Sequence, residues 1–337
     1  MSEREDEGKM EKEAPDEVTL RTPHSALRTQ NKRSLKDYLG ITVRGFCMGA
    51  ADVVPGVSGG TMAFILGIYE ELLDAIHAVN MPLIKSLLSF RFKKALGEFP
   101  YKFLIALVSG LLIAVFSLAQ FFKWALQFHS ELVWAFFFGL VLASIISVRN
   151  RVTIWSSGCI VAMVLGAVGA YILVGFVPVE TTEAAWFMFL SGAIALCAMI
   201  LPGISGSFIL VLLGKYSQLL NAVVQQDFVT LIVFACGGIV GLITFARVLR
   251  WLFHHYHNVT VAALIGLMIG SLRKVWPWKD TIETYIDRHG EVKPLIEHNI
   301  LPEALSNDVV LAIGLAIVGC GLVLIMERLA AGRVDEK

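Results

Sequence analysis

The sequence has little charge, since only 17% of its 337 residues are Asp, Glu, Lys or Arg, whereas soluble domains average about 25%. Together with a hydrophobic fraction of 56%, this scarcity excludes a soluble globular protein. There is no surplus of one sign either, because 28 basic residues balance 28 acidic ones. A nucleic-acid-binding protein would need a basic surplus on one face, so we expect no nucleic-acid partner.

Cysteines are few and widely separated. Each of the five lies singly in an apolar stretch, and no CxxC spacing indicates a metal site. They are Cys47, Cys159, Cys197, Cys236 and Cys320. We interpret them as small core residues and expect no metal and no cofactor.

The N-terminal segment lacks the apolar run of about 7 to 15 residues that a signal peptide needs. We therefore expect residues 1–37 to form a disordered cytoplasmic tail. The basic stretch from Arg21 to Lys36 favours keeping this end inside. A second cytoplasmic tail is expected at 327–337.

Long apolar runs are abundant. Six are long enough to span a bilayer, which takes about 17 to 25 residues, namely 101–124, 132–148, 154–177, 228–252, 259–276 and 309–326. Two more apolar stretches, 38–80 and 185–224, are interrupted by Pro and Gly. These runs predict an all-α, polytopic membrane protein.

The two interrupted stretches are copies of each other. Shifted by 147 residues, the first places identical residues on the second without a gap. Pro55, Gly56, Ser58, Gly59, Leu66, Gly67, Tyr69, Leu72, Leu73 and Ala75 match Pro202, Gly203, Ser205, Gly206, Leu213, Gly214, Tyr216, Leu219, Leu220 and Ala222. The similarity continues at a shift of 127 through the spans that follow. We therefore predict two repeats, 38–177 and 185–326, a pattern typical of transporters.

The distribution of Lys and Arg predicts how the repeats cross the membrane, because cytoplasmic loops are enriched in these residues. If the interrupted stretches are re-entrant hairpins, the loop from Lys85 to Lys94 lies inside, as do Arg149, Arg151 and Arg328. A single crossing would place Lys85 to Lys94 outside. Three crossings per repeat then invert the second repeat relative to the first. Both termini are cytoplasmic in this topology, and the loop 273–308 is external.

Non-helical backbone at membrane depth is tolerated only where protein buries it or where it lines a cavity. The tips of the two hairpins, 55–61 and 202–208, should therefore meet near the bilayer centre. Each tip precedes a new helix whose first N–H groups suit a phosphate. The residues expected to bind substrate are Arg44, Ser58, Gly59, Gly60, Thr61, Ser205, Gly206, Ser207 and Lys215.

Two acidic residues are candidates for coupling to a proton or cation, because ionisable groups within a membrane are costly and usually line a pathway. Asp52 lies three residues before the first tip, and Glu71 lies beyond it. Several plainer interpretations stay open. The PGxSG sequence could serve only to kink a helix, Lys215 could snorkel to the interface, and Glu71 could simply be solvated there.

At these residues the sequence resembles the polyprenyl-phosphate transporter family, also described as undecaprenyl-phosphate translocases. The resemblance extends from about Arg44 to Arg328, and its most specific parts are GFCMGAADVVPGVSGGTMAFILGIYEEL and LPGISGSFILVLLGKYSQLL. It implies a flippase that returns undecaprenyl phosphate from the outer to the inner leaflet of the bacterial cytoplasmic membrane, for reuse in cell-envelope synthesis. Polyprenyl phosphate and membrane lipids are the expected partners, and the sequence is compatible with a homodimer.

The main alternative is a membrane polyprenyl-pyrophosphate phosphatase. One such family carries a PGxSRSG motif whose Arg holds the pyrophosphate, but here Gly59 and Gly206 occupy that position. Phosphoryl transfer relies on positive charge to stabilise its transition state. We therefore expect a transporter with no catalytic residue. A carrier for a small soluble anion would use the same site without a lateral opening.

Overall fold

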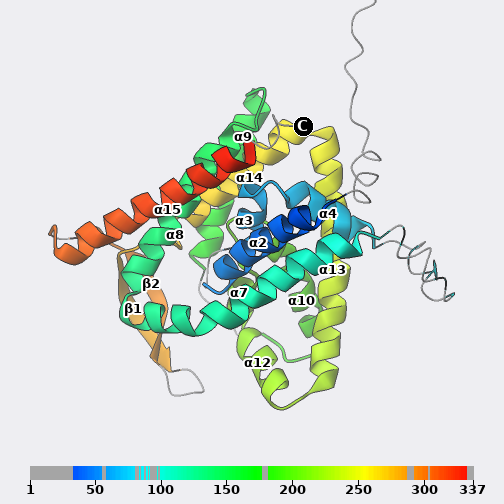
Figure 1. Ribbon diagram of the computed structural model, residues 1–337. Coiled ribbons are helices and arrows are strands. Elements are labelled where there is room, and N and C mark those ends of the chain that lie inside the picture. The colour runs from blue at the N-terminus through cyan, green and yellow to red at the C-terminus, as the bar shows by residue number, and fades with distance from the viewer. Residues whose placement is uncertain are drawn as a thin grey trace, which may run out of the picture.

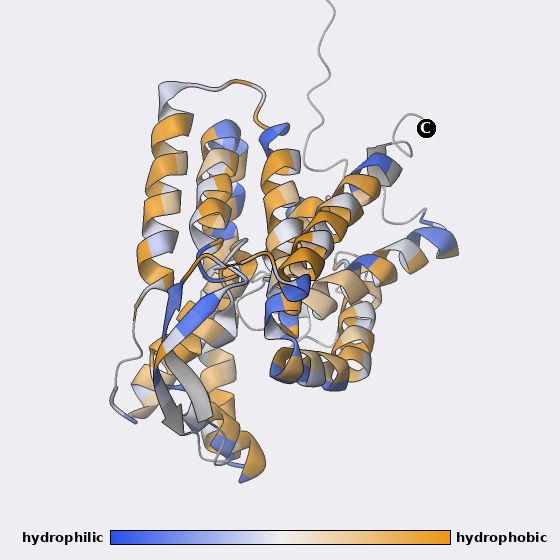
Figure 2. Ribbon diagram, turned by 90° about the vertical axis from the view of Figure 1, so that its left-hand side faces the viewer, coloured by the Kyte–Doolittle hydropathy of each residue, from blue (hydrophilic) through white to orange (hydrophobic). Residues whose placement is uncertain are grey.

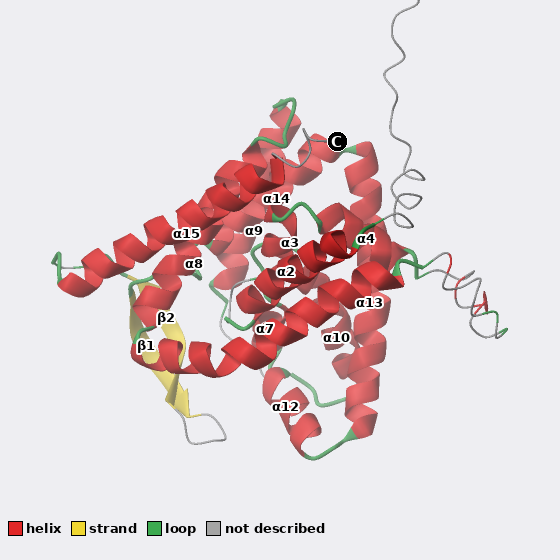
Figure 3. Cartoon of the chain, viewed as in Figure 1, coloured by secondary structure: helices red, strands yellow, loops and turns green. Residues whose placement is uncertain are grey.

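The computed structural model describes residues 33–54, 58–79, 99–176, 181–286, 292–302 and 304–331, with six single positions between 83 and 97. The protein is an all-α polytopic membrane protein that carries one two-stranded sheet in its described part (Figure 3). Among these residues, five helices are long and apolar enough to cross a membrane. They are α7 (Tyr101–Phe128), α8 (Ser130–Arg149), α9 (Ser157–Val174), α13 (Phe228–His255) and α15 (Asn307–Ala331).

Each interrupted stretch folds into one longer helix and two short ones. The first hairpin consists of α2 (Leu35–Asp52), α3 (Gly59–Ile65) and α4 (Tyr69–His77), and the second of α10 (Ala185–Ile200), α11 (Gly206–Leu212) and α12 (Tyr216–Val224). In both copies the short helices have 7 and 9 residues. Gly67 and Gly214 separate them with φ of 69° and 64°, a conformation that glycine adopts without steric cost. The chain bends by 107° between α11 and α12.

The segment expected to span at 259–276 forms a shorter helix, α14 (His257–Ser271). Beyond it the chain forms an antiparallel hairpin of β1 (Lys279–Ile286) and β2 (Val292–Asn299). From the sequence, 273–308 is predicted only as a loop, because neither strand alternates cleanly between polar and apolar residues. Figure 1 shows the two strands at the edge of the helical bundle.

The packing of the helices interlocks the two sequence repeats. Within each repeat the long hairpin helix packs on the first span, α2 on α7 and α10 on α13. The last span of each repeat packs instead on the middle span of the other, since α9 lies against α14 and α15 against α8. The two pairs correspond under the sequence repeat, so the same packing arrangement occurs twice.

Glycines at matched positions bring the backbones of these helix pairs together. An added Cβ would overlap a carbonyl oxygen of the partner helix at Gly110, Gly139, Gly237 and Gly266. Small residues of this kind allow close packing between helices within a membrane. Gly110 and Gly237, like Gly139 and Gly266, are 127 residues apart, the offset that the sequence itself reveals.

Hydrophobic residues make up most of the helices, whereas part of the β-hairpin is hydrophilic (Figure 2). Large apolar side chains point outward along the spans, as with Phe116, which is 80% exposed, and Leu165, which is 67% exposed. Helix α3 is buried throughout, from Gly59 to Ile65. Helix α3 is thus enclosed by protein, while the outer helices present the apolar surface that a bilayer requires.

Candidate functional site

The two broken segments touch each other. The Thr61 hydroxyl accepts a hydrogen bond from the Gly203 N–H at 2.9 Å, and the Ser58 hydroxyl donates to the Leu201 carbonyl at 3.1 Å. At Gly60 a Cβ would overlap the Ile200 carbonyl oxygen. The expected tip residues 55–57 lie outside the described residues. The remaining contacts bring the beginning of α3 against the break between α10 and α11.

A carboxylate of the protein itself occupies the first tip. Oδ1 of Asp52 accepts a hydrogen bond from the Gly59 N–H at 2.7 Å, and the Ser58 hydroxyl caps the Gly60 N–H at 3.1 Å. Ser58 and Thr61 are buried. The other carboxylate oxygen of Asp52 is buried and has no hydrogen-bond partner among the described residues. The N–H groups of Gly59 and Gly60 that the sequence analysis assigned to a phosphate are therefore already bonded.

The second tip is more open, and no carboxylate of the described residues bonds to it. Met199 is the residue that matches Asp52 under the repeat. Ser205 precedes α11 but makes no side-chain cap bond; its hydroxyl shares a 2.8 Å hydrogen bond with that of Ser207. Ser205 and Gly206 are half-buried and Ser207 is exposed. Two hydroxyls are therefore accessible at this tip.

The two basic residues expected to bind substrate lie in different surroundings. Arg44 is half-buried in the middle of α2. Lys215 is 2% exposed, its ammonium donates to the Gln218 side chain at 2.8 Å, and it lies 5.6 Å from the ring centre of Phe187. This burial contradicts the snorkelling interpretation. No carboxylate among the described residues forms an ion pair with Lys215.

Glu71, the second coupling candidate, is on α4 and does not contribute to the contact between the tips. Both of its carboxylate oxygens bind Arg33, at 2.6 and 3.0 Å. On the same helix Asp74 pairs with Arg250 of α13 at 2.7 Å. Glu70 lies 3.9 Å from His257 of α14. The acids of α4 thus join the first hairpin to Arg33, which precedes α2, and to basic residues of α13 and α14 in the second repeat.

A polar cluster beside the second hairpin was not predicted from the sequence. The ammonium groups of Lys274 and Lys279 each lie 3.3 Å from the same oxygen of Glu297, and that of Lys274 lies 5.4 Å from the ring centre of Phe208 on α11. Burial and the neighbouring Lys274 lower the pKa of Lys279 to about 8, despite Glu297. Burial alone would raise the pKa of Glu297, but Lys279 and Lys274 lower it. The signal in the sequence was weak, because these residues fell within a loop of mixed charge.

Known proteins resemble the chain over most of its length. A family described as undecaprenyl phosphate translocase-like matches residues 48–293. A polyprenyl-phosphate transporter of Vibrio cholerae is 39% identical over 303 residues, which make up 87% of this chain and 97% of that protein. A polyprenyl-phosphate transporter of Staphylococcus aureus is 31% identical over 254 residues, or 70% of this chain and 85% of that protein. No solved structure matches the chain.

Proposed function

The chain belongs to the undecaprenyl phosphate translocase-like family, and from this premise we propose that it transports a polyprenyl phosphate across the cytoplasmic membrane of a bacterium. The proposed direction is from the outer to the inner leaflet, which returns the lipid carrier for cell-envelope synthesis. The observation that carries this proposal is the direct contact of two broken helical segments inside an apolar bundle. Broken helices that meet at membrane depth form the substrate sites of many secondary transporters.

Alternating access requires two halves that can exchange roles. We propose that the two repeats run in opposite directions through the membrane, with both termini in the cytoplasm. The recurring glycine contacts between corresponding helices support two units of one design. In this arrangement the second hairpin enters from the outside, so its more open tip would receive the phosphate while the prenyl chain stays in lipid.

The phosphate would bind first at the second tip and then compete with Asp52 at the first. Ser205 and Ser207 offer hydroxyl donors with no carboxylate bonded beside them. At the first tip the carboxylate of Asp52 already accepts the Gly59 N–H, and two anions cannot share that donor without strong repulsion. Protonation of Asp52 would remove this repulsion, which makes Asp52 the proposed coupling group. Arg44, on the same helix, and Lys215 remain proposed phosphate contacts.

We propose that the protein is not an enzyme. Gly59 and Gly206 stand where the phosphatase motif has its arginine, so neither position supplies the charge that phosphoryl transfer needs. The test is reconstitution of the purified protein into liposomes that contain undecaprenyl phosphate or its pyrophosphate form. Movement of the monophosphate between leaflets without release of inorganic phosphate is expected. Phosphate release from the pyrophosphate lipid would overturn the proposal in favour of the phosphatase. Uptake of a soluble anion without lipid movement would favour the small-anion carrier.

The proposed order of binding can be tested by adding a carboxylate at the second tip. Met199→Asp places an acid at the second tip, at the position that matches Asp52. Because Met199 is 37% exposed, solvent weakens the repulsion between the two anions, and we expect transport to fall about 10-fold, the effect of about 1.4 kcal/mol. Met199→Asn, which has nearly the same size, is the control and should retain transport. Equal activity of both variants would contradict a phosphate site at the second tip.

Coupling of transport to a proton can be tested by a substitution at the first tip. Asp52→Asn preserves an acceptor for the Gly59 N–H but cannot release or take up a proton. We expect transport by this variant to lose its response to an imposed proton gradient, while downhill exchange continues. An unchanged response to the gradient would refute the coupling role of Asp52.

A further inference from the structure

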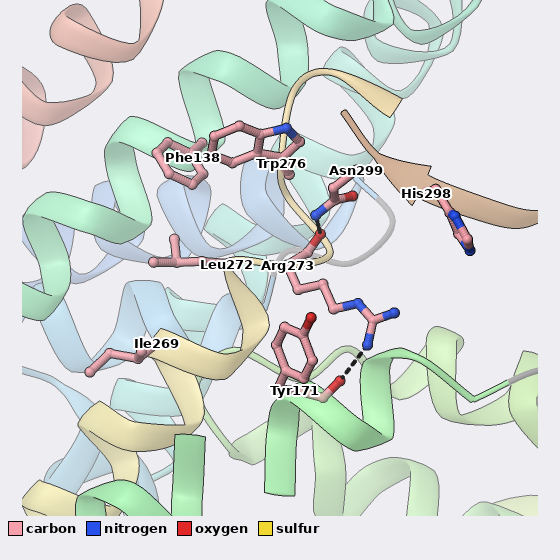
Figure 4. Close-up of a pocket in the computed structure, with 8 residues that line it drawn as sticks. All are labelled: Phe138, Tyr171, Ile269, Leu272, Arg273, Trp276, His298 and Asn299. Carbon is pink, nitrogen blue, oxygen red and sulfur yellow. Dashed lines mark hydrogen bonds between the residues drawn. The ribbon is translucent and has the colours of Figure 1, made fainter. Parts of the chain in front are cut away.

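A cavity of about 490 Å³ lies between the end of α14, helices α8 and α9, and the end of β2 (Figure 4). None of the residues expected to bind substrate lines it. The lining residues are Phe138, Tyr171, Ile269, Leu272, Arg273, Trp276, His298 and Asn299. The cavity therefore combines one permanently charged group with aromatic and aliphatic walls.

The charged group, Arg273, is held in place but not neutralised. Its Nη1 donates to the Tyr171 carbonyl at 3.1 Å, and its guanidinium lies 4.5 Å from the ring centre of Tyr171. The side chain of Asn299 donates to the Arg273 carbonyl at 2.9 Å. Among the described residues no carboxylate forms an ion pair with Arg273. Since a guanidinium has five N–H donors, most of them remain available to a ligand.

The surroundings of Arg273 are positive. The next residue, Lys274, shares the single carboxylate of Glu297 with Lys279, so three cations adjoin one acid. Asp280 pairs with the lining residue His298 across the strands, but it is exposed and does not line the cavity. A net positive charge beside a concave site attracts anions.

The remaining walls suit the part of a lipid next to its head group. Trp276 is fixed by a 2.8 Å hydrogen bond from its indole N–H to the Ile300 carbonyl and meets the ring of Phe138 edge-on, with the ring centres 5.4 Å apart. Ile269 is 38% exposed and Tyr171 is 54% exposed, so the cavity adjoins apolar outer surface. Tryptophan and tyrosine are enriched where lipid head groups begin.

We propose that this cavity is a second lipid site, which holds the phosphate head group of a membrane lipid on Arg273 while the hydrocarbon chain lies along α9 and α14. Arg273 has the planar fork that binds phosphate through two hydrogen bonds. The lining residues of the cavity are distinct from those of the hairpin tips.

The experiment counts bound lipids on the intact purified protein by native mass spectrometry, and measures affinity by calorimetry with farnesyl phosphate. Wild type should bind one more molecule than Arg273→Ala. At this site Arg273→Ala should weaken affinity about 10-fold or more, as expected for the loss of a charged hydrogen-bond donor. Arg273→Lys should fall between the two, because it keeps the charge but loses the fork. Equal stoichiometry in wild type and Arg273→Ala would overturn the proposal.

Two further variants test whether lipid binding depends on the cavity itself and not on positive charge at the surface. Arg149→Ala removes one exposed positive charge at the end of α8, and binding should be unchanged. Leu272→Trp fills the cavity without altering charge and should remove the same single molecule as Arg273→Ala, provided that circular dichroism shows an intact helical fold. Retention of the full stoichiometry in Leu272→Trp would contradict the cavity as the site, whatever becomes of Arg273→Ala.

The source of the phosphate is tested with two more probes. Farnesol, which lacks the phosphate, should not occupy the site. Inorganic phosphate, which lacks the chain, should bind far more weakly than farnesyl phosphate. If inorganic phosphate bound as tightly as farnesyl phosphate in an Arg273-dependent manner, the assignment to a lipid would be wrong. A Ser205→Ala, Ser207→Ala variant should keep the Arg273-dependent molecule, so a failure of the transport proposal would remain distinguishable.

Discussion

The first hairpin (α2, α3 and α4) is held by charges of the protein, whereas the second hairpin (α10, α11 and α12) is held mainly by neutral groups. In the first, the Asp52 carboxylate bonds the start of α3, and the acids of α4 lie beside basic residues of three other segments. In the second, Met199 matches Asp52. Ser217, Gln218 and Asn221 match Glu70, Glu71 and Asp74.

This difference arises on nearly the same backbone, since the short helices have equal lengths in both copies. The repeat supplies the architecture, and the polar residues decide how firmly each hairpin is closed. A transporter with two equally stable hairpins would have no preferred orientation. We expect the charges of the first hairpin instead to favour a state in which the second tip is the accessible one.

The largest effect should come from the glycine at the contact of the tips. In Gly60→Ala the new methyl group would overlap the backbone oxygen of Ile200, which the first hairpin cannot avoid without moving. Overpacking of this kind costs about 1–3 kcal/mol or more, so we expect a lower unfolding temperature and loss of transport. The measurement is thermal unfolding of the purified protein together with the liposome assay.

Two other glycines serve as comparisons. Gly40→Ala, in α2, meets nothing within 4 Å and should not destabilise the protein. Gly206→Ala would bring a Cβ to 2.7 Å from the Ala195 oxygen, and its cost should be smaller because the second tip is more open. A larger cost at Gly206 than at Gly60 would reverse the comparison between the hairpins.

The sequence was enough to predict the broken segments and the helices around them. The repeat made this possible, because a glycine and a tyrosine recur at the same place in both copies, Gly67 and Tyr69 matching Gly214 and Tyr216. In the structure the two glycines lie just beyond the ends of α3 and α11, and the two tyrosines are the first residues of α4 and α12. The ends of short helices depend on the local backbone conformation, which the residue types at those positions indicate.

What the sequence did not predict depends on contacts between distant residues. The bond from Gly59 to Asp52 requires the chain to fold back at a break whose shape spacing does not determine. The pair of Glu71 with Arg33 joins residues that are 38 positions apart. The cluster around Glu297 requires the strand pairing of β1 and β2. Composition and periodicity carry no information on these side-chain partners.

A pH-dependent effect of intermediate size is expected beside the second hairpin. Lys279 has a pKa of about 8 in the folded protein, against 10.5 for a free lysine, because it is buried. Between these values the unfolded chain binds more protons, so stability should rise with pH. Each unit of pKa difference contributes about 1.4 kcal/mol at most. Below pH 8 the lysine is protonated in both states and the penalty stays constant.

Thermal unfolding between pH 7 and 11 measures this slope. Lys279→Met should remove it. Glu297 cannot supply the slope, because its pKa is lowered in the folded protein and it is ionised in both states over this range. The assignment to Lys279 would be contradicted if the slope persisted in Lys279→Met. It would also be contradicted if the wild type lost stability from pH 8 to 10.5 relative to that variant.

The smallest effect should come from the ion pairs of α4. The paired side chains of Glu71 and Asp74 are each 26% exposed, and ion pairs near the surface contribute about 0.2–1 kcal/mol each. Glu71→Gln combined with Asp74→Asn should therefore speed hydrogen exchange of the α3 amides only a few-fold, and high salt should reduce the difference. The control Ser217→Ala with Asn221→Ala, at the α12 positions that match Glu70 and Asp74, should leave exchange in α11 unaltered. If α3 exchanged at the wild-type rate without these acids, Asp52 and the contacts of Gly60 would close the first hairpin by themselves, and the contrast between the hairpins would lie at their tips alone.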